Sequence, residues 1–211
     1  MASSFSAQIP VIINVIRQLR PATVLDVGKG FGKYGFLIHE YVGIDSSRRP
    51  DPSKTLSEQS AIAIDAVECN PDYMWPHIRQ LYRQTYLGRI EELHSTLPRY
   101  DLVLMCDVIE HLEKAAGLKV VQHFIASGSA VLISSPTDYF NQELFGSADE
   151  HHVSHWTAAD FRLPTGYCEY QTADAGRVYL VSPVPLDVRG FGNGLVKRAR
   201  RIARVLRDEL C

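Results

Sequence analysis

The sequence feature that most constrains the fold is a run of β-branched residues followed by three regularly spaced glycines. The run is residues 23–27, TVLDV; Gly28, Gly30 and Gly32 follow at alternate positions, and residues 34–41 can then form a helix. β-Branched residues favour strands, and glycine lets the backbone turn tightly and approach a ligand without a Cβ in the way. A strand, a glycine turn and a helix in this order predict the first unit of a parallel α/β sheet that binds a nucleoside cofactor.

The same alternation of strands and helices continues along the chain. Further strands are predicted at residues 61–68, 85–87, 100–106 and 130–134, and helices at residues 9–19, 72–82 and 114–126. Two final strands, at residues 167–173 and 177–184, predict an antiparallel hairpin. The chain is therefore expected to form a doubly wound, Rossmann-like α/β fold whose sheet is mostly parallel, with the hairpin at its edge.

Length and composition favour one domain. The 211 residues are 45% hydrophobic and 22% charged, near the average for soluble globular proteins. We expect a domain at residues 1–185, with a polar surface insertion at about 45–60, and a basic helical tail at residues 186–211. The tail is either a docked amphipathic helix with a solvated basic face or a contact for RNA, an anionic membrane or a partner protein.

Charge and hydropathy narrow the partners and the compartment. The formal net charge of -2 gives no general attraction to polyanions, so an RNA contact is expected only through the basic tail. No apolar run approaches the roughly 18 to 20 residues that span a bilayer, so no transmembrane segment and a cytoplasmic protein are expected. The sequence does not indicate an oligomeric state.

Two carboxylates at predicted strand ends suggest which cofactor binds. Asp26 directly precedes the glycine turn, where it suits a cationic ligand such as the aminoacyl ammonium of S-adenosylmethionine and would oppose a pyrophosphate. Glu68 ends the second predicted strand, where a carboxylate can accept both ribose hydroxyl protons. Asp45 competes for that role at a more usual spacing, but Glu68 is favoured because a strand precedes it and a helix-forming segment follows it.

Four segments taken together resemble the class I S-adenosylmethionine-dependent methyltransferases. They are DVGKGFG at 26–32, AVECNPDY at 66–73, YDLVLMCDVIEHLEK at 100–114 and AVLISSP at 130–136. The resemblance implies a seven-stranded sheet with an antiparallel last strand.

The same resemblance assigns cofactor contacts to individual residues. It implies that Asp26 and the three glycines surround the methionine part of the cofactor, that Glu68 with neighbouring Cys69 holds the ribose, and that Arg89 and Ile90 lie at the adenine. Many relatives carry an Asp where this chain has Arg89, which has no acceptor for the adenine amino group.

A second group of ionisable residues follows the fourth and fifth predicted strands. Asp107, Glu110 and His111 come directly after one, beside the expected methyl donor, and His152 comes after the other. His111 or His152 can act as general base on a hydroxyl, with Asp107 beside them. Alternatively Asp107, Glu110, His111 and His152 bind magnesium, manganese or iron, or the histidines only fix local structure or position the substrate. Nearby Trp156 is expected either to floor an acceptor pocket or to pack in the core.

Several functions remain open at this point. The metal-binding alternative is motivated by a resemblance to the metal-dependent enzymes that 2′-O-methylate the 3′ ends of small RNAs, although Asp107 stands where those enzymes have a Glu. The pattern H-x-S-x-W, His152 to Trp156, resembles small bacterial methyltransferases equally well. We favour O-methylation of a small-molecule acceptor, such as a natural product or a sugar. The alternatives are an RNA 3′-terminal ribose methyltransferase, a non-catalytic cofactor-binding regulator and, more weakly, a dehydrogenase.

Overall fold

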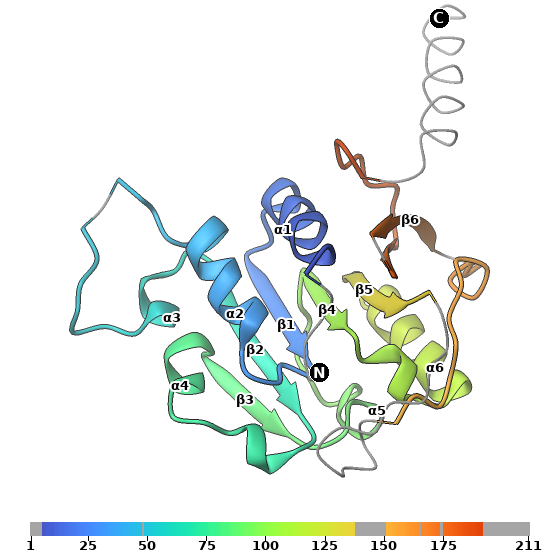
Figure 1. Cartoon of the computed structure of the whole chain (residues 1–211), viewed down its shortest axis with the longest axis horizontal. Coiled ribbons are helices and arrows are strands. Elements are labelled where there is room, and N and C mark those ends of the chain that lie inside the picture. Colours follow the sequence, from blue (N-terminus) through green and yellow to red (C-terminus); the bar gives the residue numbers. More distant parts are fainter. Residues whose placement is uncertain (1–5, 48, 138–150, 165, 174, 192–211) are drawn as a thin grey trace, which may run out of the picture.

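The computed structural model describes residues 6–47, 49–137, 151–164, 166–173 and 175–191 (Figure 1). The strands are β1 (Thr23–Val27), β2 (Ala63–Glu68), β3 (Gln84–Leu87), β4 (Leu102–Cys106), β5 (Ala130–Pro136), β6 (Tyr167–Ala173) and β7 (Gly176–Ser182). The helices are α1 (Gln8–Leu19), α2 (Lys33–Ile38), η1 (His39–Gly43), α3 (Leu56–Gln59), η2 (Pro71–Tyr73), α4 (Ile78–Leu81), α5 (Ile90–Leu93), η3 (Ile109–His111) and α6 (Lys114–Ala126).

The seven strands form one sheet in the order β3-β2-β1-β4-β5-β7-β6. β4 is the central strand and pairs in parallel with β1 and β5, and β1 pairs in parallel with β2. β7 runs antiparallel to both β5 and β6, so the predicted edge hairpin is confirmed. Because β1, β2, β4 and β5 are parallel, their carboxyl ends meet at one edge of the sheet, where open α/β sheets bind ligands.

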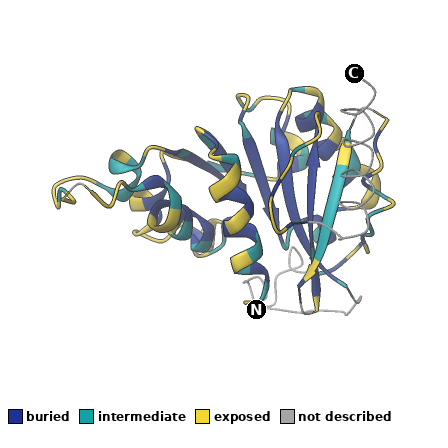
Figure 2. Ribbon diagram, turned by 90° about the horizontal axis from the view of Figure 1, so that it is seen from above, coloured by how far each residue is buried: buried dark blue, intermediate teal, exposed yellow. Residues whose placement is uncertain are grey.

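Two hydrophobic clusters cover the two faces of the sheet. The side chains of Val24, Ile64 and Leu104 pack with α1 and α2 on one face, whereas those of Leu25 and Val103 pack with α6 on the other. Figure 2 shows the central strands as buried and the edge strand β6 as half-buried. This explains the nearly continuous apolar runs of the central strands, because each has both faces covered.

One predicted helix is wrong. Residues 72–82 do not form a continuous helix: η2 ends at Tyr73, and the short α4 begins only at Ile78. Pro76 explains the break, because a proline disfavours helical backbone at the preceding residue and has no N–H to donate. The segment between them therefore runs as a loop at the carboxyl end of β2.

The predicted insertion and tail have different outcomes. Residues 45–60 lie mainly in exposed loops, apart from α3, whose first turn is closed by a capping box between Thr55 and Glu58. Most of the predicted basic tail, residues 192–211, lies outside the described residues. Within the described part of the chain, no helix combines the length and the apolar character needed to cross a membrane.

Candidate functional site

The glycine turn joins β1 to α2 in a conformation that suits glycine. Gly28, Gly30 and Gly32 have φ values of 66°, 51° and 82°, in the left-handed region that side chains disfavour. The amide of Gly28 donates to the carbonyl oxygen of Val67, 2.9 Å away, and the amide of Gly30 donates to Oε2 of Glu68, 3.0 Å away. The turn is thus held against the end of β2.

The three glycines differ in what surrounds them. Gly28 is exposed and Gly30 half-buried, so their backbones are open to a ligand. Gly32 is buried, and a Cβ there would lie 2.8 Å from Cδ1 of Leu81, so this glycine lets the turn pack against α4. A Cβ on Gly28 would lie 2.5 Å from Cγ2 of Val108, in the loop after β4.

Asp26 is a buried carboxylate beneath the turn. It is 2% exposed, and the hydroxyl of Tyr82 donates to its Oδ2 over 2.6 Å. Burial raises the pKa of Asp26 from its ordinary 3.8 to about 6, against the lowering effects of the Tyr82 hydrogen bond and of Lys29. Asp26 is therefore mostly ionised at neutral pH, which suits a cationic ligand.

Glu68 is the last residue of β2 and is 4% exposed. Each carboxylate oxygen accepts one backbone N–H, Oε2 from Gly30 and Oε1 from Asn70, both over 3.0 Å. An ionised carboxylate offers about four lone-pair positions, so capacity remains for ligand hydroxyls. The competing Asp45 lies exposed in the loop after η1, away from any strand end.

The other residues expected to contact the cofactor, Cys69 at the ribose and Arg89 and Ile90 at the adenine, differ in exposure. Cys69 and Arg89 are exposed, and Nη2 of Arg89 lies 3.1 Å from Oε1 of Glu91. Ile90 is 4% exposed and packs in the core with Val67. The side chain of Ile90 therefore stabilises the sheet, and an adenine in this region would meet mainly the backbone of residues 88–90.

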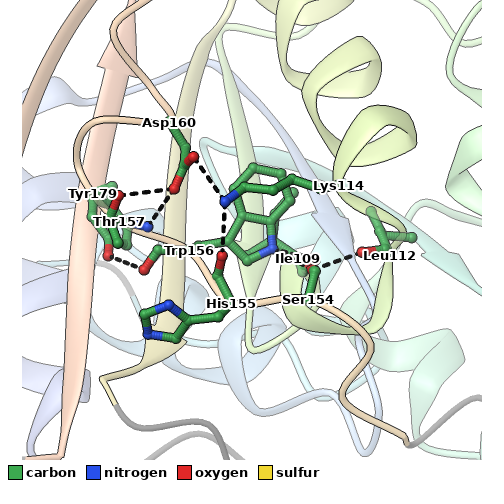
Figure 3. Close-up of polar contacts among 9 residues, drawn as sticks. All are labelled: Ile109, Leu112, Lys114, Ser154, His155, Trp156, Thr157, Asp160 and Tyr179. Atoms are coloured by element: carbon green, nitrogen blue, oxygen red, sulfur yellow. Dashed lines mark hydrogen bonds and ion pairs between the residues drawn. The ribbon is translucent and has the colours of Figure 1, made fainter.

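An extended segment, residues 151–157, is fastened across the loop after β4. Its residues alternate, with His152, Ser154 and Trp156 buried, whereas Val153 and His155 are exposed. The Ser154 hydroxyl donates to the carbonyl oxygen of Leu112 over 2.7 Å, and Nε1 of Trp156 donates to that of Ile109 over 2.9 Å (Figure 3). The three named positions of the H-x-S-x-W pattern are thus the buried side of an extended segment.

Helix α6 and strand β7 hold the same segment from outside. The Lys114 Nζ lies 2.8 Å from Oδ1 of Asp160 and donates to the carbonyl oxygen of His155. The Tyr179 hydroxyl donates to the carbonyl oxygen of Trp156 (Figure 3). The Trp156 ring is 1% exposed and stacks on Phe161. Trp156 is therefore a core residue, as one of the two interpretations expected.

These contacts bring Glu110, His111 and His152 together. Each offers one ligand atom, and the three atoms lie within 4.8 Å of one another. Glu110 is 2% exposed, its Oε2 has no hydrogen-bond partner among the described residues, and burial together with nearby Asp107 raises its pKa well above the ordinary value. The cluster can hold a proton or a cation.

His111 has a defined tautomer when neutral. Its Nδ1 lies 3.0 Å from the carbonyl oxygen of His151, and because a carbonyl oxygen only accepts, Nδ1 carries the proton. Nε2 then has a free lone pair, as in a general base or a metal-bound histidine. The His111 and His152 rings meet edge to face, with centroids 5.0 Å apart.

Asp107 lies outside this three-residue group. It follows β4 with a φ of 53°, which is unusual for a side-chain-bearing residue, and Oδ1 accepts from the Ser134 hydroxyl over 2.9 Å. Burial lowers the pKa of Lys33, and the charge of Asp107 opposes that change. Asp107 therefore lies between the glycine turn and the cluster, where such a strained backbone is often functional.

Sequence reasoning missed several residues around the glycine turn. Lys29 is 4% exposed, and Tyr82 reaches Asp26 from the end of α4. Phe31 and Trp75 are 41% and 51% exposed and meet edge to face at the turn, with centroids 5.1 Å apart. The only sequence signal for the two aromatics was their position next to Gly30 and to the break at Pro76.

Comparisons with known proteins find likeness in structure alone. No protein-family model matches the sequence, and no curated protein sequence matches it. An O-methyltransferase family protein from Burkholderia thailandensis superposes with a TM-score of 0.56 at 16% identity, over 83% of this chain and 55% of that one. A methyltransferase from Geobacter sulfurreducens gives 0.56 at 9% identity, over 86% of this chain and 81% of that one.

The small RNA methyltransferase HEN1 is similar too, with a TM-score of 0.58 at 16% identity over 90% of this chain. This chain spans about half the length of the Burkholderia protein and 27% of HEN1. At these identities the likeness is one of fold. The strand order and the antiparallel β7 agree with it, so the chain has the Rossmann-like fold of class I S-adenosylmethionine-dependent methyltransferases.

Proposed function

We propose that this protein transfers a methyl group from S-adenosylmethionine to a hydroxyl oxygen of a small molecule, such as a natural product or a sugar. The observation that carries the proposal is the Glu110, His111 and His152 cluster, which stands beside a glycine turn of cofactor-binding geometry. Val108 connects the cluster to the glycine turn, because it contacts Gly28 and precedes Glu110 by two residues.

The residues at the turn suit S-adenosylmethionine. Asp26 is a mostly ionised carboxylate for the aminoacyl ammonium, and Glu68 retains lone pairs for the ribose hydroxyls. Gly28 and Gly30 present backbone without side chains between these two carboxylates. When bound there, S-adenosylmethionine would supply a methyl group on a positively charged sulfur.

His111 is the proposed general base. Because the His151 carbonyl holds the proton on Nδ1, Nε2 can accept the hydroxyl proton of the acceptor. With S-adenosylmethionine bound, the acceptor oxygen would take the methyl carbon as the carbon–sulfur bond breaks, and S-adenosylhomocysteine would leave. Buried Glu110 lies next to both histidines, and its carboxyl oxygen can accept a hydrogen bond from the resulting imidazolium. The fold likeness to the Burkholderia O-methyltransferase family protein supports an oxygen acceptor.

Two measurements test this function in sequence. Calorimetry with S-adenosylhomocysteine should give micromolar binding, and transfer of a radiolabelled methyl group to a panel of phenols, sugars and nucleosides should continue in a chelator. Absence of cofactor binding would refute the proposal. Binding with no labelled acceptor in the panel would favour a cofactor-binding regulator.

A second candidate, methylation of the 3′-terminal ribose of RNA, is favoured by the same cluster. Carboxylate and imidazole donors within 4.8 Å suit magnesium, manganese or iron, and a cation there would explain why Oε2 of Glu110 has no hydrogen-bond partner in the described part of the chain. A divalent cation would acidify the ribose hydroxyl. Loss of RNA methylation on adding EDTA, with rescue by manganese, would decide for this candidate.

A further inference from the structure

Lys29 is an unusual residue for the interior of a glycine turn. It stands between Gly28 and Gly30, yet its side chain is 4% exposed and turns inward. Its Nζ donates to the carbonyl oxygen of Tyr73 over 2.8 Å and to that of Gly30 over 3.2 Å. The first bond crosses from the turn to η2, the short helix that follows β2.

That bond is one of several that fasten the glycine turn to the end of β2 and to the residues that follow it. The amide of Gly30 donates to Glu68, His77 Nε2 donates to the carbonyl oxygen of Phe31 over 3.0 Å, and the rings of Phe31 and Tyr73 meet edge to face. Glu68 contributes a buried carboxylate to these contacts, and Lys29 brings a positive charge into the same interior.

The charge of Lys29 interacts with those of the two carboxylates of the proposed cofactor site. Burial lowers the pKa of Lys29, and the charges of Glu68 and Asp26 oppose that change. An ammonium without such partners would be expensive to bury, and an apolar side chain would fill the same space at less cost. The charge therefore has a use that packing does not explain.

The use follows from the surroundings of Asp26. Lys29, Lys33 and the Tyr82 hydroxyl favour its ionised form, whereas burial and Glu68 disfavour it. The buried thiol of Cys106 is also close to it. The negative charge of Glu68 disfavours ionisation of the buried Asp26, so a nearby cation helps Asp26 to remain a carboxylate at neutral pH.

We propose that Lys29 is a positioning residue of the cofactor site, which clamps the glycine turn onto η2 and keeps Asp26 in the carboxylate form that meets the cofactor. This inference rests on the proposed binding of S-adenosylmethionine. It extends that function by assigning Lys29 control of the pH range in which the cofactor binds.

The test compares two substitutions by calorimetry with S-adenosylhomocysteine at pH 6 and pH 8.5. Lys29→Gln keeps N–H donors for the two carbonyls and removes the charge, whereas Lys29→Met removes both. For each protein, the readout is the dissociation constant at pH 6 divided by that at pH 8.5. Any direct repulsion between Lys29 and the cofactor ammonium cancels in this ratio. Lys119→Met, an exposed lysine on α6, is the matched control.

The wild type should bind about twofold more weakly at pH 6, where Asp26 is half protonated. A neighbouring cation lowers the pKa of a carboxyl by about one unit or more, so the ratio should rise to about tenfold in Lys29→Gln. In an Asp26→Asn background the same substitution should leave the ratio unchanged. If Lys29→Met fails to fold, Lys29→Gln carries the test.

The outcomes separate this inference from the proposed function. A wild-type protein that binds neither S-adenosylmethionine nor S-adenosylhomocysteine refutes the function itself. A wild-type protein that binds, together with a Lys29→Gln ratio equal to the wild-type ratio, refutes the role of Lys29 alone. An equal rise in Lys119→Met would also refute it, because the effect would then come from net charge.

Discussion

Replacing Asp26 with Asn should make the ligand-free protein more stable at alkaline pH. The rise in its pKa from 3.8 to about 6 means that ionising this buried carboxyl costs the folded state about 3 kcal/mol, at 1.36 kcal/mol per pKa unit. The sign follows from linkage, since the folded state holds the proton more tightly than the unfolded chain. The cost is absent below pH 3.8 and complete above about pH 6.

Urea denaturation at two pH values tests this reasoning. At pH 8, Asp26→Asn should raise the free energy of unfolding by about 2 to 3 kcal/mol, because Asn bears no charge and still accepts from Tyr82. At pH 4.5 the gain should shrink to about 1 kcal/mol. The same variant should lose affinity for S-adenosylhomocysteine. A variant that is destabilised equally at both pH values would show that burial does not raise the pKa of Asp26.

Three further substitutions address other parts of the site. Gly30→Val should lower the affinity for S-adenosylhomocysteine at least about a hundredfold in calorimetry, because a β-branched residue is strained at a φ of 51° and fills ligand space; unchanged affinity would mean that the cofactor lies elsewhere. His111→Ala should cut methyl transfer roughly a hundredfold with cofactor affinity retained, the usual scale for a lost base, whereas exposed His155→Ala should have little effect. Equal turnover in both would remove His111 from the mechanism. Trp156→Ala should cost about 3 to 5 kcal/mol in urea unfolding, and a loss below about 1 kcal/mol would contradict its place in the core.

The sheet was predictable because its strands have strong local signals. The β-branched run at β1 and the apolar run at β4 are buried on both faces, and each ends where a glycine or an acidic residue begins a turn. Helix α6 matches its predicted bounds. Since parallel strands share one edge, the sequence also located Asp26, Glu68 and Glu110 at a common edge.

The features of the site that could not be predicted from the sequence depend on contacts between residues far apart in the chain. The side chain of Lys29 turns inward because Tyr73, 44 residues later, offers it a carbonyl oxygen. The gathering of Glu110, His111 and His152 depends on how Ser154 fastens its segment, which no local pattern specifies. The failed helix at 72–82 was a local error, because Pro76 was available as a signal.

The contact between Gly28 and Val108 joins the glycine turn after β1 to the loop after β4, so these two segments do not move independently. With so little space between them that even a Cβ would overlap Cγ2 of Val108, a displacement of the loop after β4 must push the turn after β1. Close-packed surfaces transmit such shifts with little loss. Any side chain at position 28 would have to push these two loops apart, so the contact restricts the first position of the turn to glycine.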